Sequence, residues 1–497
     1  MLEALRAQLG AQFPPAMAHG LAQVYLSRGN ALFGQGDAMA ALADYGRAIA
    51  IWEALREQLG GEFSPAMANG LASVYMNRGA ALSGQGGATA ALEDYGRAIA
   101  IWEALREQLG AQFSPAMADN LAGAYGKWGV ILRAQGDATA ALLDFGRAIA
   151  MWEALREQLG GQFPPAMADG LAKVYVNRGN ALFKQGDATA ALVDFGRAIA
   201  MWEALREQLG AQFSPAMANN LASAYMNRGV VLLSQGGAAT ALEAYERAIA
   251  IWEALREQLG AQFPPAMADN LAGAYGNCGL TLFGQGDATA ALEDYGRAIA
   301  IWEALREQLG AQFSPAMANN LASAYLNRGN VLLKQGDATA ALEDYGRAIA
   351  IREALREQLG AQFLSDKGDA AAAVADYGRA IAIREALREQ LGAQFSPDTA
   401  DNLASAYVNR GNAFSDQGDA AAALEDYGRA IAIREALRGQ LGAQLPPTMA
   451  DSLARVYMKR GLTLFGEGDA AAALADYAQA RAGSFPRIWP TTWRAPT

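Results

Sequence analysis

The sequence has almost none of the residues that build covalent cross-links or metal centres. It contains one cysteine, Cys278, and one histidine, His19, among 497 residues. A disulfide framework needs paired cysteines, and a structural zinc site needs several Cys or His ligands, so this chain alone can form neither. The scarcity favours a reducing compartment, and we expect no metal and no cofactor.

Long apolar runs and an excess of basic charge are also missing. No stretch of about eighteen uncharged apolar residues occurs. The N-terminus lacks the basic region and apolar segment of a secretory signal. Lys and Arg total 40 against 51 acidic residues, for a net charge of -11. We therefore expect a soluble, cytoplasmic protein that binds neither nucleic acid nor a membrane.

What the sequence does contain is one segment repeated at a period of fifty residues. The stretch WEALREQLGAQFSPAMANNLASAY beginning at Trp202 recurs beginning at Trp302. This register holds from 1 to 350, a shortened copy fills 351–382, and two full copies follow. Self-similarity at such a period indicates stacked structural units, that is, a solenoid.

Each copy contains start and stop signals for two helices. In the second copy, Ser64 is a suitable N-cap before Pro65, and Gly86 stands where a left-handed residue closes a helix. These signals predict a first helix over 65–85. A second helix is predicted over 88–109, because apolar residues recur there at steps of three and four until Gly110.

A family resemblance rests on the spacing of small and aromatic residues in each copy. The motif-bearing positions of the second copy are Tyr75, Arg78, Gly79, Leu82, Ala91, Tyr95 and Ala98. This pattern resembles the tetratricopeptide repeat. It departs from it at Arg78, where Leu is usual, and at Glu103, which replaces the closing proline. The longer period resembles the kinesin-light-chain variety of the repeat. The resemblance implies an all-α, right-handed α-solenoid of helix-turn-helix units and a non-catalytic, protein-binding role.

The repeat register also predicts the domain organisation. Residues 1–363 form an array of seven helix pairs preceded by an orphan helix end at 1–9. Residues 364–482 form a C-terminal block whose shortened first copy lacks its first helix, so that 338–359 pairs with 370–391. The tail 483–497 is unrelated to the repeat, and disorder is expected there.

Differences between copies concentrate on one face of the first helix. Ser73, Met76 and Ala80 of the second copy represent the changeable columns, opposite the core positions. In the resembling family this face lines a concave groove that holds peptides. Neutral drift is the alternative. The exposed side of the second helix, for example Arg106 and Glu107, hardly changes apart from Ala7 and Gly439, which argues against drift.

Asparagines recur on this face and are the main candidate contacts. One column holds Asn77, Asn177, Asn227, Asn277, Asn327 and Asn409, and a neighbouring column holds Asn180, Asn330 and Asn412. An amide both donates and accepts, so a row of amides suits the backbone of an extended peptide. The first column resembles the asparagine ladder of some family members. The alternative is that Asn-Arg-Gly is a common structural motif in such repeats.

Lys173 and Lys184 flank Asn177 and Asn180 and make the most polar patch on this face. The set loosely resembles the Lys and Asn clamp with which family members grip a terminal carboxylate. A solvated lysine pair is the alternative interpretation.

Other recurring residues predict packing rather than chemistry. A tryptophan such as Trp102 recurs on the apolar side of the second helix in six successive copies, which favours inter-repeat packing. Glu103 and Arg106 suit a solvated, salt-bridged face. Paired carboxylates without a histidine or a pocket signal do not indicate acid-base catalysis, so no enzyme is predicted.

Two functional hypotheses follow. The first is a scaffold that binds an extended peptide or a partner helix along the first-helix groove. The second is a structural protein whose open ends allow end-to-end self-association. A sensor portion of a larger signalling protein is a further alternative.

Overall fold

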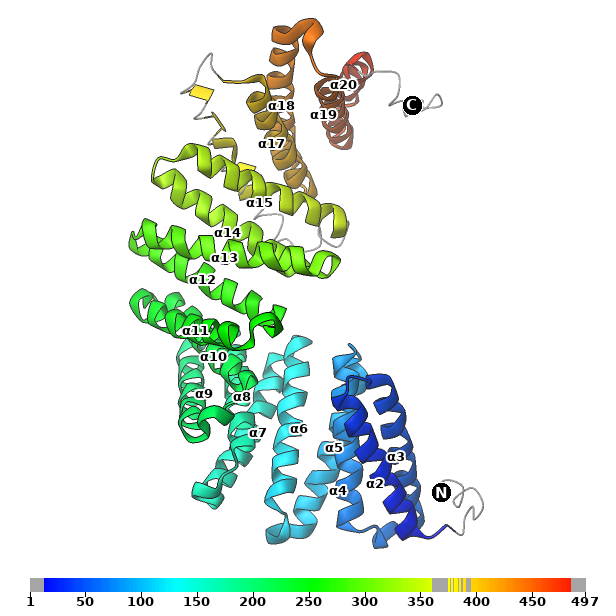
Figure 1. The fold of residues 1–497 in the computed structure, drawn as a ribbon. Coiled ribbons are helices and arrows are strands. Elements are labelled where there is room, and N and C mark those ends of the chain that lie inside the picture. The colour runs from blue at the N-terminus through cyan, green and yellow to red at the C-terminus, as the bar shows by residue number, and fades with distance from the viewer. Residues whose placement is uncertain are drawn as a thin grey trace. The chain divides into compact units, whose positions relative to one another are not determined.

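The computed structural model describes residues 13–359 and 395–483, with isolated helical positions between 374 and 389. It divides into two compact units, Met1–Phe263 and Pro264–Thr497. The described residues are helical with short turns and contain no strand (Figure 1). The boundary at residue 364, the helix predicted over 370–391, the helix end at 1–9 and the tail beyond 483 lie outside the described residues or are only partly covered. They stay predictions.

Two kinds of helix alternate along each unit, and we call them helix A and helix B. In the first unit, helices A are α2 (Pro15–Gly34), α4 (Pro65–Gly84), α6 (Pro115–Ala134), α8 (Pro165–Lys184) and α10 (Pro215–Ser234), and helices B are α3 (Ala38–Leu59), α5 (Ala88–Leu109), α7 (Ala138–Leu159), α9 (Ala188–Leu209) and α11 (Ala238–Leu259). In the second unit, α12 (Pro265–Gln285), α14 (Pro315–Lys334), α17 (Pro397–Asp416) and α19 (Pro447–Gly466) are helices A. Helices B there are α13 (Ala288–Leu309), α15 (Ala338–Leu359), α18 (Ala420–Leu441) and α20 (Ala470–Gly483). The predicted all-α helix-turn-helix architecture is confirmed.

The helix ends follow from local chemistry. The Ser64 hydroxyl accepts the backbone N–H of Met67 at 3.3 Å, which caps α4 beside Pro65. Gly86 closes the same helix with φ of 82°, and Gly110 begins the turn to the next repeat with φ of 50°. Both values lie in the left-handed region, where a side chain would be strained. Three of the predicted helix ends are therefore set by single residues.

Small residues allow helices A and B of one repeat to cross closely. A Cβ atom at Gly79 would lie 2.9 Å from Cε1 of Tyr95 on α5. Tyr95 belongs to a buried cluster with Ala91 and Ile131, the latter from the next repeat. The glycine of the family motif thus makes room for the aromatic ring that joins successive repeats.

The recurring tryptophans pack between repeats, as predicted. Trp52 is fully buried, and its Nε1 donates to Nδ1 of His19 at 2.9 Å within its own repeat. Its ring also meets the next repeat, because a Cβ at Gly70 would lie 2.8 Å from its Cζ2 atom. Burial lowers the pKa of His19. The isolated histidine is therefore a packing partner of tryptophan.

The departure from the family pattern at Arg78 has a structural role. The Nε and Nη2 atoms of Arg78 donate to both oxygens of Asp94 at 2.6 and 2.7 Å, and Asp94 is buried. This two-bond pairing links helix A to helix B. The same pair is formed by Arg28 and Asp44, Arg178 and Asp194, Arg328 and Asp344, Arg410 and Asp426, and Arg460 and Asp476.

The sixth repeat lacks this arginine and provides a test of its contribution. Cys278 takes the arginine's place and hydrogen-bonds Asp294, whose pKa is raised above its ordinary value of 3.8 by burial. In the first repeat the hydrogen bond from Arg28 lowers the pKa of Asp44 instead. We expect Cys278→Arg to increase the free energy of unfolding at pH 7 by about 1–3 kcal/mol.

The pH dependence separates this effect from simple repacking. With a raised folded pKa, Asp294 stabilises the fold most below pH 3.8 and less as pH rises through the folded value. If an arginine at position 278 lowers the folded pKa, as Arg28 does for Asp44 in the first repeat, the stabilisation appears above pH 3.8 and is lost in acid. Denaturant titrations from pH 3 to pH 7 should show the gain growing with pH. An equal gain in Cys278→Ala would contradict the ion-pair explanation.

Candidate functional site

The predicted site residues all lie on helices A. Asn77 lies on α4; Lys173, Asn177, Asn180 and Lys184 on α8; Asn227 on α10; Asn277 on α12; Asn327 and Asn330 on α14; and Asn409 and Asn412 on α17. The asparagines are half-buried and the two lysines are exposed. Helices α2, α4, α6, α8 and α10 contact one another in sequence, as do α12 with α14 and α17 with α19. We call the surface formed by these helices the helix-A face.

Some of the asparagines bind one another and helix B. The Asn77 amide donates to the side-chain oxygen of Asn30 on α2 at 2.9 Å, and the Tyr45 hydroxyl of α3 donates to the same oxygen at 2.9 Å. Asn412 likewise accepts from Tyr427 and Lys459, and Asn330 from Tyr345. These amides help to hold neighbouring helices together, so part of their hydrogen-bonding capacity is used internally.

The amides on α8 are placed differently. Helix B of this repeat has Phe195 where most other copies have tyrosine, so no hydroxyl is present to bond Asn180. Within the described residues, neither Asn177 nor Asn180 makes a side-chain hydrogen bond. Lys173 is paired with Asp169 at 2.6 Å, while Lys184 is exposed on the same helix. The two amides therefore keep their donors and acceptors for other groups.

Lys127 on α6 was not among the predicted site residues, although it occupies the asparagine column in the third repeat. Its side chain is exposed, yet surrounding protein desolvates the ammonium group and lowers its pKa, and the charge of Lys173 on α8 lowers it further. No acidic side chain in the described ranges pairs with Lys127. The sequence shows a lysine in the asparagine column. Only the structure shows that it is desolvated and close to Lys173 on the next helix A.

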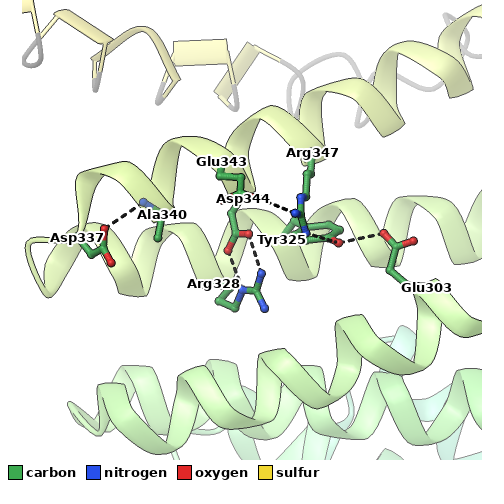
Figure 2. Close-up of polar contacts among 8 residues, drawn as sticks. All are labelled: Glu303, Tyr325, Arg328, Asp337, Ala340, Glu343, Asp344 and Arg347. Atoms are coloured by element: carbon green, nitrogen blue, oxygen red, sulfur yellow. Dashed lines mark hydrogen bonds and ion pairs between the residues drawn. The ribbon is translucent and has the colours of Figure 1, made fainter.

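A second recurrent arrangement lies between consecutive helices B, and Figure 2 shows it in the second unit. The Tyr325 hydroxyl on α14 donates to Glu303 of α13 at 3.0 Å and accepts from Arg347 of α15 at 3.3 Å. The guanidinium groups of Arg328 and Arg347 lie over the tyrosine ring, 5.6 and 5.5 Å from its centre. Burial raises the pKa of Tyr325. The sequence did not reveal this network.

The same arrangement lines cavities in the first unit. One cavity of about 590 Å³ is bounded by Glu153, Arg156, Tyr175 and Arg197, among others. Another, of about 420 Å³, is bounded by Glu103, Arg106, Tyr125 and Arg147 together with Ala150 and Met151. These volumes fall in the range of small-ligand sites.

Neither surface has the composition of a metal centre. Across the parts of the chain that the structure describes, no three His, Cys, Asp or Glu side chains are grouped so that they could hold a metal ion.

None of the described helices combines the length and the apolar character needed to span a membrane.

The family model of the tetratricopeptide repeat matches six segments, at residues 71–107, 171–207, 221–257, 271–307, 319–356 and 403–440. Each matched segment begins in helix A and ends in helix B of the same repeat. These six segments of the chain are tetratricopeptide repeats. Their likeness to the kinesin-light-chain variety stays a prediction.

Several solved structures resemble the chain at low sequence identity. The apo form of RapI is 13% identical, with a TM-score of 0.44, covering 85% of this chain and 99% of its own. Nro1 of S. pombe, a nuclear import adaptor, is 12% identical with a TM-score of 0.43, covering 62% of this chain and 99% of its own. MamA is 17% identical with a TM-score of 0.29, covering 46% and 96%. No curated protein matches the chain.

Proposed function

We propose that the chain is a non-catalytic scaffold that binds an extended peptide or a partner helix along the helix-A face. The observation that carries this proposal is the state of Lys127. It is exposed, neighbouring atoms desolvate it, and it lies near Lys173. No acidic side chain in the described ranges pairs with Lys127 itself. A cation in that state gains more from an incoming anionic group than a fully solvated lysine does.

The neighbouring amides supply the second half of the proposed contact. Asn177 and Asn180 are half-buried on α8 and have no side-chain hydrogen bonds among the described residues. They can donate to and accept from a peptide backbone whatever its sequence. Lys127 would then favour peptides that carry a carboxylate near these amides. Asn77 is a poorer candidate, because its amide already donates to Asn30.

Peptide selection on the purified chain tests this proposal. Short peptides selected against the wild type are measured again on the variant with Lys127, Asn177 and Asn180 all changed to alanine. We expect the dissociation constant to rise at least about 10-fold, since each lost charge-assisted bond is worth over 1 kcal/mol. Asn77→Ala is the matched control and should change it little. Equal binding by the triple variant and the wild type would refute the helix-A proposal.

End-to-end self-association is the alternative function, and exposed apolar side chains favour it. Leu462 and Phe465 on α19 and Leu474 on α20 are exposed in the last described repeat. Exposed apolar side chains of this kind can be covered by another copy of the chain. Light scattering across a range of concentrations distinguishes the two, because stacking requires mass to grow with concentration. A constant monomer mass would remove this alternative.

A further inference from the structure

Helices α7 and α9 differ from the other helices B in the same three columns. The first column has a large exposed apolar residue where the other described copies have glutamate or alanine, the second has phenylalanine in place of tyrosine, and the third has methionine in place of isoleucine. These residues are Leu143, Phe145 and Met151 on α7, and Val193, Phe195 and Met201 on α9. The helix-B surface is therefore not uniform along the array, and its two exceptional helices belong to consecutive repeats.

The first substitution changes both exposure and charge. Leu143 and Val193 expose 58% and 51% of their surface. In the seventh repeat, Glu343 occupies this column and pairs with Arg347 one turn later at 2.6 Å (Figure 2). In the described ranges Arg197 has no carboxylate partner, and it donates to the Tyr175 hydroxyl at 3.4 Å. Arg97 and Arg247 also bond a tyrosine hydroxyl, but each keeps a glutamate one turn earlier, where Arg197 has only Val193. An apolar side chain and an unneutralised guanidinium thus lie on the same helical face.

Arg197 also borders the cavity of about 590 Å³. Residues of α7 and α9 form its walls, and Tyr175 and Arg178 of α8 lie between them. Its one lining carboxylate, Glu153, is occupied on both oxygens, by the Tyr175 hydroxyl at 2.8 Å and by Arg156 at 2.6 Å. Arg178 is occupied by Asp194. The positive charge left for a ligand is therefore that of Arg197.

The cavity of about 420 Å³ lies on the other side of α7, against α5 and α6. Arg147 and Met151 of α7 line it. Arg147 donates to Asp144 at 3.0 Å, so this cavity is less basic than its neighbour. Methionine side chains adapt to varied apolar partners. Helix α7 is therefore bordered by two hollows that each contain an arginine and a methionine.

We propose that the helix-B side of α7 and α9 is a second docking surface, which takes an acidic peptide segment with apolar side chains. A ligand carboxylate pairs with Arg197 in the larger cavity, and apolar ligand side chains cover Leu143, Val193 and the methionines. Charge complementarity selects the acid, because a guanidinium without a partner keeps most of its five donors for a planar carboxylate. This surface involves other residues than the helix-A face and does not depend on the function proposed for it.

The probe for this surface is an acetylated peptide of three Glu-Glu-Leu units, titrated into the full chain by calorimetry at low salt. The peptides of three Gln-Gln-Leu and three Glu-Glu-Ala units report the separate contributions of charge and apolar side chains. We expect both to bind at least about tenfold more weakly, because each lacks one of the two complementary groups.

The decisive variant is Val193→Glu, which installs the residue found in most other copies. Its carboxylate can pair with Arg197 as Glu343 pairs with Arg347, so the repeat should fold normally while the cation is occupied. We expect this variant and Arg197→Gln to lower the affinity for the probe at least about tenfold. Circular dichroism of Val193→Glu should match that of the wild type.

Lys127→Gln, which removes a charge from the helix-A face, controls for binding at that site. Because the helix-A face is also expected to favour carboxylates, this variant measures any share of the probe that binds there, and it should lower the affinity for the probe less than Val193→Glu does. If Lys127→Gln weakens the probe and Val193→Glu does not, the acidic peptide binds the helix-A face and the second docking surface is refuted. The second docking surface is also refuted if neither variant alters binding, or if the probe fails to bind the wild type. The helix-A proposal is tested separately, by the peptides selected against the purified chain.

Discussion

Replacing Asp194 with alanine should lower the local free energy of unfolding by about 3–5 kcal/mol, the usual cost of removing one partner of a buried ion pair. Asp194 is 1% exposed and accepts two bonds of 2.7 Å from Arg178. Without the carboxylate, the guanidinium stays between α8 and α9 with no compensating charge. Hydrogen exchange of these two helices measures the effect, because distant repeats of a solenoid need not unfold together.

The fifth repeat supplies a control of opposite sign. There Arg228 is retained, but the buried Ala244 stands in the place of the aspartate. We expect Ala244→Asp to slow exchange in α10 and α11, since it completes the pair that Arg178 and Asp194 make one repeat earlier. In a double-mutant cycle, Arg178→Ala combined with Asp194→Ala should cost less than the sum of the two. Additive losses would show that the pair contributes through packing alone.

Replacing Trp302 with alanine should be similarly destabilising, by about 3–5 kcal/mol. The side chain is 3% exposed, and its Nε1 donates to Asp269 at 2.6 Å. Truncation removes a large packed ring between helices and also removes the hydrogen bond to a carboxylate. Denaturant unfolding followed by circular dichroism, together with exchange in α12 and α13, measures the loss.

Arginine is a sharper replacement at this position, because the chain already uses it. In the C-terminal repeats Arg434 occupies the tryptophan column, is buried, and bonds Asp401 at 2.7 Å and Ser405 at 2.8 Å. Trp302→Arg should therefore cost less than Trp302→Ala, since Asp269 can neutralise the new charge.

Trp252→Arg provides the matched comparison. Trp252 bonds Asn219 rather than an aspartate, at 2.8 Å. The introduced cation would find no carboxylate in that column, and burying an unpaired charge is costly. We expect Trp252→Arg to be at least as destabilising as Trp252→Ala. If Trp302→Arg and Trp252→Arg are equally tolerated, the carboxylate of Asp269 does not explain why arginine is accepted in this column.

The tryptophan column also shows what a change between copies means in this chain. The change to arginine in the last repeats could be seen in the sequence, but the reason for it could not. Arg434 lies 33 residues from Asp401, and only the crossing of α17 and α18 brings them to hydrogen-bonding distance. A difference between near-identical copies can thus be explained once the residue that it contacts on the other helix is known.

The candidate site was predictable in position but not in detail. The sequence placed the asparagines on one face of helix A, since residues on one helical face follow a fixed period. It could not show that Asn77 donates to Asn30, forty-seven residues away, or that Asn180 lacks a tyrosine partner. It also gave no reason to single out Lys127, because the desolvation of a lysine depends on neighbouring helices.

The sequence by itself determined the helices, their ends and their order, because caps, glycine positions and apolar spacing act within a few residues of the chain. It also determined the repeat. The tertiary structure decided which polar groups are paired. Arg178 with Asp194, Tyr175 with Glu153, and the unpaired Arg197 all depend on the distance between helices in space. Apolar packing tolerates many sequences, whereas an ion pair or hydrogen bond requires two particular atoms within about 3 Å.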